Sequence, residues 1–349
     1  MNVSRKHLKL MQLSWDYSNT PIYTSIFMGE NVHAQLATLL SQKPVGYIHS
    51  IFENGINIAF GKKLIFVGTT KNGMLPYGIH MRQEQVRRLR FYVKQNQTVI
   101  AQSADLIHFD HPDYPMTIDL SMASRFQYTI DSSQYLNYHD LINDDAMDHL
   151  HFIKKERTGL GATWEEFFRD TDEIRLELSI ETTIRNKNEL MQILLSEANI
   201  DKQKLDRLLR YFLGRGQGLT PSGDDYIVGL LAVHTLTQAF HPAFVSTLRQ
   251  LIETEELTTD VSKSYLLHAL EGRFSDKITH VIHALTLKDT LLFQAKLIRL
   301  LQTGHSSGID TALGIIHALI TIRRNHHVKT RCNCLGGERH PTTSPRSNI

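Results

Sequence analysis

The clearest chemical signal in the sequence is a glycine-rich segment that leads into an apolar helix pattern. It combines four glycines, two hydroxyl side chains and two adjacent carboxylates: Gly214, Gly216, Gly218, Thr220, Ser222, Gly223, Asp224 and Asp225. Glycine tolerates positive φ angles and lets a ligand approach the backbone closely. The helix predicted from Tyr226 to Leu236 would follow with free N–H groups and the positive end of its dipole. This order of residues predicts an anion-binding site.

The two adjacent aspartates add a second kind of chemistry. Asp224 and Asp225 could act as catalytic residues in proton transfer, or bind Mg²⁺ that bridges to a bound phosphate. Ser222 and Asp225 also have the spacing of a capping box, which would only begin a helix, so this structural interpretation stays open. No Gly-Lys-Ser/Thr follows, and the segment comes after a helical stripe instead of a strand, which excludes P-loop and dinucleotide-binding signatures.

A second copy of the pattern lies between Gly304 and Gly314. Both copies read Ser-Gly-x-Asp-x-x-x-Gly, so four residues of the first have equivalents in the second: Ser307, Gly308, Asp310 and Gly314. A glycine inside a helix costs about 1 kcal/mol relative to alanine. Its recurrence at one offset predicts two helices that cross closely at Gly229 and Gly314, with both N-termini converging on one ligand and Asp310 as a third catalytic candidate. A duplicated helical hairpin without a ligand is the alternative.

Further candidates lie close to these two segments or between them. Thr259 and Ser262 begin another predicted helix and could line the site, although N-capping explains them nearly as well. His305 could donate a hydrogen bond or a proton, or be an ordinary loop residue. The predicted substrate-binding set is Gly216, Gly218, Thr220, Ser222, Gly223, Thr259, Ser262, His305, Ser307 and Gly308.

Three weaker features have mainly structural explanations. Arg215 could contact a phosphate, but a solvated arginine is the commoner outcome. The segment from Gly73 to Gly78 could carry a substrate loop, although a β-turn explains it better. The histidines and cysteines of the C-terminal tail do not have the spacing of a standard zinc site; they are His326, His327, Cys332, Cys334 and His340.

Two kinds of hydrophobic pattern divide the chain. Short apolar or alternating runs separated by turns predict strands in the first half, at residues 45–52, 56–60, 63–69, 97–109, 117–122 and 125–131, while residues 83–95 fit helix or strand. Apolar residues at i, i+3 and i+4 predict helices in the second half, including 260–270, 276–286 and 290–302. We therefore predict an α+β protein with a β-rich domain (1–150), a mainly helical domain (151–324) and a disordered tail (325–349).

Composition narrows the classes of partner. The chain has 349 residues, a net charge of +2 and 41% hydrophobic residues, which is ordinary for a globular protein and argues against nucleic acid as a partner. Its two cysteines exclude a disulfide framework. The sequence lacks an apolar run of the ~20 residues that a membrane helix needs, and its first residues do not resemble a secretory signal. We expect a cytoplasmic protein without membrane contact.

Three blocks resemble the bacterial AllH family over roughly residues 210 to 320: GLTPSGDDYIVGLL, TTDVSKSYLLHALEGRFSD and GHSSGIDTALGII. The resemblance implies a subunit of oxamate carbamoyltransferase, which converts oxalurate and phosphate into oxamate and carbamoyl phosphate during anaerobic allantoin breakdown. It also implies partner subunits similar to AllF and AllG. The family's loop tends to read Gly-Leu-Gly-Pro-Gly, whereas Arg215 and Gln217 stand in the second and fourth positions here.

Two other functions remain open at the level of sequence. The chain could act alone on another anionic metabolite, or it could be a non-catalytic scaffold or ligand-binding subunit. Only the anion site follows from the residues themselves, and the carbamoyl chemistry follows from the resemblance.

Overall fold

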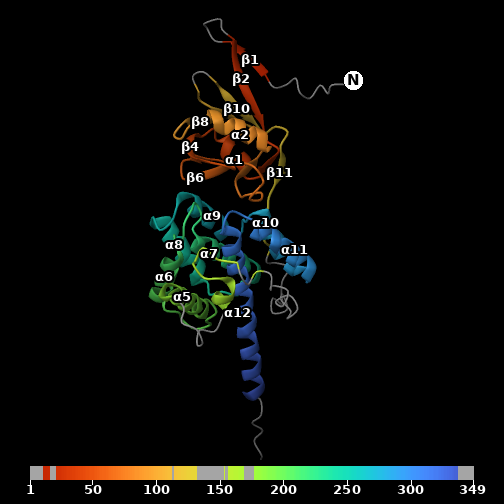
Figure 1. Ribbon diagram of the computed structural model, residues 1–349. Helices are drawn as coiled ribbons and strands as arrows, with labels where there is room; N and C mark the ends of the chain where they lie inside the picture. Colours follow the sequence, from red (N-terminus) through yellow and green to blue (C-terminus); the bar gives the residue numbers. More distant parts are fainter. Residues whose placement is uncertain are drawn as a thin grey trace, which may run out of the picture.

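The chain folds into an N-terminal β-rich half and a C-terminal helical half (Figure 1), which confirms the predicted α+β class. The computed structural model describes the backbone of residues 11–15, 21–111, 114–131, 153, 156–168 and 177–336, and within these ranges the side chains of residues 25–325. The predicted domain boundary at residue 150 lies outside the described residues. Among those residues, no helix combines the length and apolar character required to cross a membrane.

One sheet makes up most of the N-terminal half. Its strand order is β1-β2-β10-β9-β8-β4-β5-β6-β7-β3-β11. The strands are β1 (Met11–Trp15), β2 (Pro21–Met28), β3 (Asn31–His33), β4 (Val45–Phe52), β5 (Gly55–Phe60), β6 (Lys63–Gly68), β7 (Gly78–His80), β8 (Thr98–Ala101), β9 (Leu106–Phe109), β10 (Met116–Asp119) and β11 (Ser124–Phe126). Although β3 follows directly after β2, β2 pairs with β10 while β3 pairs with β7 and β11. The sheet therefore curls back on itself around one buried apolar core.

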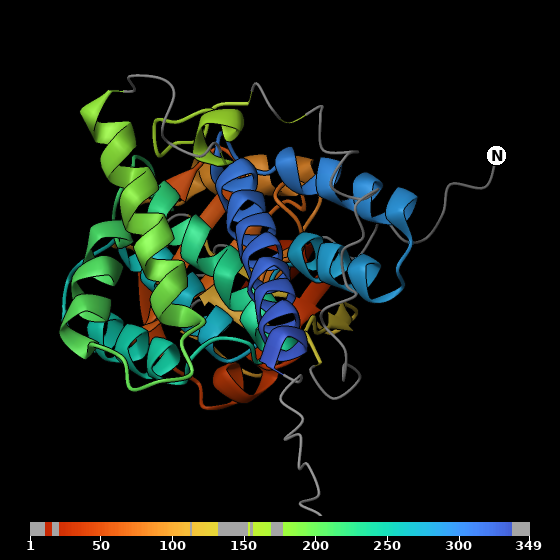
Figure 2. The ribbon, with the colours of Figure 1, turned by 90° about the horizontal axis from the view of Figure 1, so that it is seen from below.

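Two helices accompany the sheet, and the others form the second half around a core of their own. The two helices beside the sheet are α1 (Leu36–Ser41) and α2 (Gln83–Tyr92). The helices of the second half are α4 (Trp164–Phe168), α5 (Leu178–Leu194), α6 (Lys202–Phe212), α7 (Ser222–Thr237), α8 (Ala243–Thr254), α9 (Asp260–Leu270), α10 (Asp276–Thr286), α11 (Thr290–Leu301) and α12 (Ser307–Gly336). Viewed from the helical side, α12 lies in front of the molecule with the other helices around it and the strands behind (Figure 2).

Local sequence signals fix several of these elements. The predicted strand at 45–52 is β4, and the predicted helices at 260–270 and 276–286 are α9 and α10. Four of the described helices begin where a side-chain oxygen accepts a backbone N–H, as N-capping residues do; Asp201 accepts from Lys204, Thr259 from Ser262, Ser275 from Ile278 and Asp289 from Leu292. Of the ambiguous residues 83–95, Gln83–Tyr92 form α2, which buries Val86 and Leu89.

The C-terminal tail differs from its prediction. Residues 325–336 continue α12 as helical backbone, although we predicted a disordered tail from residue 325. The physical reason is that neither glycine nor proline interrupts the chain between Gly314 and Gly336, so each added residue extends an existing helix at little cost. Residues 337–349 lie outside the described part of the chain, and so do the side chains of the His/Cys set.

The buried centre of the helical half is the contact between α7 and α12. Almost every residue of α7 is buried. A Cβ added to Gly229 would overlap the carbonyl oxygen of Thr311 and lie 2.8 Å from the backbone nitrogen of Ile315. A Cβ added to Gly314 would overlap the carbonyl oxygen of Tyr226. The predicted crossing at Gly229 and Gly314 is therefore confirmed, and it brings two helix backbones into direct contact.

The two halves of the molecule meet at α9 and at the start of α10. The backbone N–H of Met74, in the loop before β7, donates to Asp276 Oδ1 (2.8 Å), and Asp276 N donates to the Met74 carbonyl (3.1 Å). Tyr77 stacks on His268 with 4.6 Å between ring centroids. The segment from Gly73 to Gly78 thus joins the sheet to the helices, in agreement with a structural role.

Substitution of Gly314 by alanine should lower the free energy of unfolding. Alanine is normally the better helix former by about 1 kcal/mol, but here its methyl group would force two backbones apart. We expect a net loss of about 1–3 kcal/mol, the range for overpacked cores, measured by urea denaturation. Thr235→Ala, a truncation at a partly exposed position of α7, is the control; equal or higher stability of the Gly314 variant would contradict the close crossing.

Candidate active site at two helix N-termini

The candidate site is built from two equivalent loop–helix units. The first is α6, residues 213–221 and α7, and the second is α11, residues 302–306 and α12. In each unit a glycine in the first turn of the second helix packs on the carbonyl at the end of the first, Gly223 on Phe212 and Gly308 on Leu300. Their N–H groups donate back to the preceding loop, Gly223 to Arg215 O (2.8 Å) and Gly308 to Thr303 O (3.0 Å). The sequence repeat is therefore a structural repeat.

Serines and aspartates of the two units form crossed hydrogen bonds. Ser222, at the start of α7, hydrogen-bonds to Asp310 of α12, and Ser307, at the start of α12, hydrogen-bonds to Asp225 of α7. Thr220 Oγ1 lies 2.9 Å from Ser307 Oγ. Pro221, rather than a capping side chain, precedes α7, and Ser222 makes no cap hydrogen bond. The capping-box interpretation of Ser222 is therefore wrong, because its hydroxyl is directed to the other helix.

Asp310 is a fully buried carboxyl with one oxygen available. Its Oδ1 accepts from the backbone N–H of Gly159 (2.9 Å), and Ser222 and Ser306 also hydrogen-bond to this side chain. Its Oδ2 is buried and makes no hydrogen bond to a described residue. Burial raises the pKa of Asp310 to about 6, against the opposing effect of these hydrogen bonds.

Asp225 lies beside Asp310 and also keeps a buried Oδ2 that no described residue contacts by a hydrogen bond. Its pKa is raised well above the usual value, firstly by burial and then by the negative charges of Asp310 and Asp224. The phenol of Tyr265, on α9, is near enough to feel the charge of Asp225. Since like charges in a shared buried site cannot both ionise easily, this pair keeps a proton at pH values at which an exposed aspartate has lost it.

Asp224 differs from its neighbour because protein donors occupy both of its oxygens. The N–H of Gly214 donates to Oδ1 (2.9 Å), while Ser262 (2.8 Å) and Thr258 donate to Oδ2. Burial raises the pKa of Asp224, and these hydrogen bonds act against the rise. Asp224 thus fixes the glycine loop and the start of α9, and Asp225 is the aspartate with an oxygen left for a ligand.

The glycine loop itself presents backbone donors to solvent. Residues 216–219 are exposed, and the N–H groups of residues 216–220 and 222 make no hydrogen bond within the described part of the chain. Gly216 has φ 119°, and a Cβ there would lie 2.7 Å from Ser222 N. Thr259 Oγ1 donates to the carbonyl of Leu219 (2.5 Å) while capping α9. Consecutive N–H groups held in this way form a concavity suited to an anion.

The remaining predicted residues lie at the edge of the site. Ser262 and Thr259 position Asp224 and the loop as described, Gly218 faces open space, and His305 is exposed just before α12. Arg215 packs on the ring of Tyr211 (4.3 Å to the centroid), which gives its guanidinium a structural contact. Among described residues, no group of three or more His, Cys, Asp or Glu side chains could hold a metal ion.

Sequence reasoning missed four residues that the fold adds to the site. Gly159, Ser306, Thr258 and Tyr265 contact or lie near the three aspartates. Gly159 belongs to Gly159-Leu160-Gly161, a second alternation of glycines that could have marked a loop at this site. A Cβ on Gly159 would overlap Ser222 Oγ, so only glycine fits between the two helices there.

The fold and site define a two-part α+β protein whose helical half surrounds a buried carboxyl pair with a duplicated loop–helix unit. Residues 212–319 match the family model of the oxamate carbamoyltransferase subunit AllH, and residues 24–130 match the AllH family N-terminal domain. The chain belongs to the AllH family, as its motifs predicted. No solved structure matches the chain.

The raised pKa of Asp310 leads to a pH-dependent stability prediction. The folded protein holds this proton up to pH about 6, whereas an ordinary aspartate releases it near 3.8, so wild-type stability falls as the pH rises through that window. Asp310→Asn is neutral throughout and can still accept from Gly159. We expect the variant to gain on the order of 2–3 kcal/mol relative to wild type between pH 4 and pH 7.5, measured by urea denaturation. A difference independent of pH would show that Asp310 is not held protonated.

Proposed function

We propose that this chain is a catalytic subunit of an oxamate carbamoyltransferase, with its active site between the N-termini of α7 and α12. In the reaction, phosphate attacks the carbamoyl carbon of oxalurate, a C–O bond forms, and the C–N bond to oxamate breaks. The proton of the phosphate ends on the oxamate nitrogen, so the products are carbamoyl phosphate and oxamate. The family match supports the reaction class.

The observation that carries the proposal is the pair of buried, unpartnered oxygens, Asp225 Oδ2 and Asp310 Oδ2. A carboxyl group with a raised pKa can take the phosphate proton and return it to the leaving nitrogen. Two helix N-termini stabilise the negative charge that remains on the pair. A residue in this position would supply proton transfer without a covalent intermediate.

The glycine loop supplies the complementary part of the site. The unpaired N–H groups of residues 216–220 suit phosphate or carboxylate oxygens and the oxyanion of the tetrahedral intermediate. Thr220 and Ser307 add hydroxyl donors between the loop and Asp225. Such fixed donors stabilise developing charge without reorganisation during the reaction.

Mg²⁺ would have to bind differently from the predicted Asp224–Asp225 set. Both oxygens of Asp224 are occupied by protein donors, whereas Asp225 and Asp310 each keep one free. Two carboxylates with waters and a substrate phosphate are a common environment for Mg²⁺. We therefore propose that any Mg²⁺ used in the reaction contacts Asp225 and Asp310, and that chelation with EDTA tests whether the reaction needs it.

We further propose that the chain works in a cytoplasmic complex with subunits similar to AllF and AllG, in anaerobic use of allantoin nitrogen. The decisive experiment measures carbamoyl phosphate formed from oxalurate and phosphate by the chain alone and with co-expressed partner subunits. Activity of the chain alone would favour a stand-alone enzyme. Activity that survives loss of the carboxyl pair would favour a scaffold.

Asp225→Asn should reduce this activity at least about 100-fold, the lower range for general acid–base catalysis. Its stability should be equal to that of wild type or higher, because the buried carboxyl is replaced by a neutral amide. Asp206→Asn, the same change at a surface ion pair of α6, is the control and should keep full activity. Full activity of the Asp225 variant would contradict the proposal.

Gly216→Ala should raise the KM for phosphate. Alanine at φ 119° is strained and would displace the loop from Ser222 N, and loss of one hydrogen bond to a charged ligand corresponds to about 10- to 100-fold in affinity. Gly61→Ala, also at positive φ but in the turn between β5 and β6, controls for backbone strain alone. An unchanged KM in the Gly216 variant would place the phosphate elsewhere.

A further inference from the structure

A cavity of about 710 Å³ lies between the two halves of the molecule, where α9 contacts β6 (Figure 1). Its sheet side is formed by β4, β5, β6, the turn between β5 and β6, and the residue before β7. Its helical side is formed by α8, α9 and residues that follow each of these helices. The volume is in the range of small-molecule sites, which often lie where two parts of a protein meet.

Helix α9 separates this cavity from the candidate active site. Ser262 and Tyr265 of this helix lie toward the aspartates of the active site. Asp260, Lys263 and Leu267 line the cavity instead. Residues three or four positions apart share one face of a helix, so two different faces of α9 serve the two places. The cavity is therefore distinct from the carboxyl-pair site.

The cavity is electropositive around Tyr77. Lys63 Nζ lies 5.6 Å from the centroid of the Tyr77 ring, on which His268 stacks. Burial together with neighbouring basic groups lowers the pKa of His268 to about 3, so this ring is neutral. Arg273 forms an ion pair with Glu271, whereas Lys63 has neither an ion pair nor a hydrogen bond within the described part of the chain. Lys63 is therefore the cation that an anionic group can reach here.

The helical side of the cavity carries carboxylates. Glu253 forms an ion pair with Arg249 (3.5 Å) along α8. Asp260 lies 3.1 Å from His49 of β4. Glu256, between α8 and α9, makes no ion pair or hydrogen bond to any residue that the structure describes. One cation on the sheet side and one carboxylate on the helical side thus line the same cavity without a described partner.

We propose that this cavity binds a zwitterionic amino acid, with its carboxylate on Lys63, its ammonium group on Glu256 and its side chain on apolar surface. Tyr47, Leu64 and Leu267 supply that surface. Two separated charges of opposite sign are complementary to a molecule that carries both, whereas a singly charged ligand would leave one of them unpaired. The binding of an amino acid here does not rest on the proposed carbamoyl transfer.

Calorimetric titration of the full chain tests the proposal with L-phenylalanine and L-leucine as probes. We expect saturable binding of at least one of them. Its N-acetyl derivative lacks the ammonium group and its amide lacks the carboxylate. Each derivative should bind at least about tenfold more weakly than the parent amino acid, because each loses one charged contact.

Two variants assign the charges. Lys63→Gln should weaken binding of the amino acid at least about tenfold but should not weaken binding of its amide, which has no carboxylate to lose. Glu256→Gln should weaken binding of the amino acid equally but not that of the N-acetyl derivative. Both positions are exposed, so neither change removes a buried contact. A variant that merely disturbed the structure would weaken binding of every probe.

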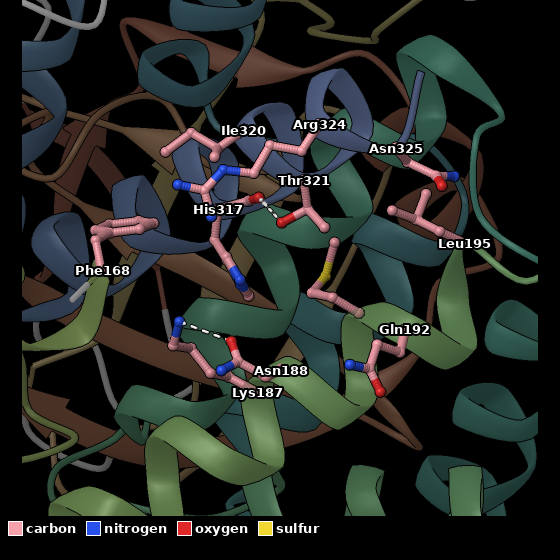
Figure 3. A pocket seen from close by; sticks show the side chains of 11 residues that line it. Phe168, Lys187, Asn188, Gln192, Leu195, His317, Ile320, Thr321, Arg324 and Asn325 are labelled. Carbon is pink, nitrogen blue, oxygen red and sulfur yellow. Dashed lines mark hydrogen bonds between the residues drawn. The ribbon is translucent and has the colours of Figure 1, made fainter. Parts of the chain in front are cut away.

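A second cavity, of about 560 Å³ between α5 and α12, supplies the control (Figure 3). Arg324→Gln changes an exposed residue that lines only this second cavity, and it should leave binding unchanged. The proposal would be overturned by absence of saturable binding of both amino acids or by equal binding of their derivatives. Unchanged affinity in Lys63→Gln or Glu256→Gln, or loss of binding in Arg324→Gln, would overturn it as well.

Discussion

The helical half depends on the direct contact of two helix backbones at Gly229 and Gly314. No side chain separates α7 from α12 at this point, so the two axes come closer than any larger residue would allow. Because the glycines stand at the same offset in both helices, the contact also aligns the helix N-termini. The crossed bonds of Ser222 to Asp310 and of Ser307 to Asp225 follow from that alignment. A substitution at the crossing that moves either helix would therefore also move Asp225 or Asp310.

Three aspartates lie within one small region and differ because their surroundings differ. Asp224 accepts hydrogen bonds at both oxygens and connects the glycine loop to α9. Asp225 and Asp310 each keep one buried oxygen free, and burial raises the pKa of both. The positive ends of two helix dipoles offset part of the cost of this pair. The hydrogen bonds and burial of each carboxyl group, more than its residue type, therefore decide whether it has a structural or a chemical role.

The same long helix α12 connects several regions of the molecule. Its N-terminus carries Ser307 and Asp310, and about two turns later His317 contacts both α7 and the cavity beside α5. Near the N-terminus of α12, the loop before β7 contacts the start of α10 through Met74 and Asp276. Lys277 Nζ, one residue further, reaches Thr303 Oγ1 in the loop before α12 (3.0 Å). The sheet is thereby joined to one of the two loops of the candidate site.

The sequence by itself determined the features that depend on residues close together in the chain. These are the α+β class, the bounds of α9 and α10, the glycine crossing and the two loop–helix units. Their signals are caps, hydrophobic periods and a repeated spacing, all of which operate over a few residues. The tertiary structure alone decided that Ser222 bonds to Asp310 instead of capping its own helix, that Asp224 is fully hydrogen-bonded while Asp225 is not, and that Gly159 and Tyr265 join the site. These contacts link positions far apart in the chain, so packing of whole helices, which no local spacing encodes, had to place them.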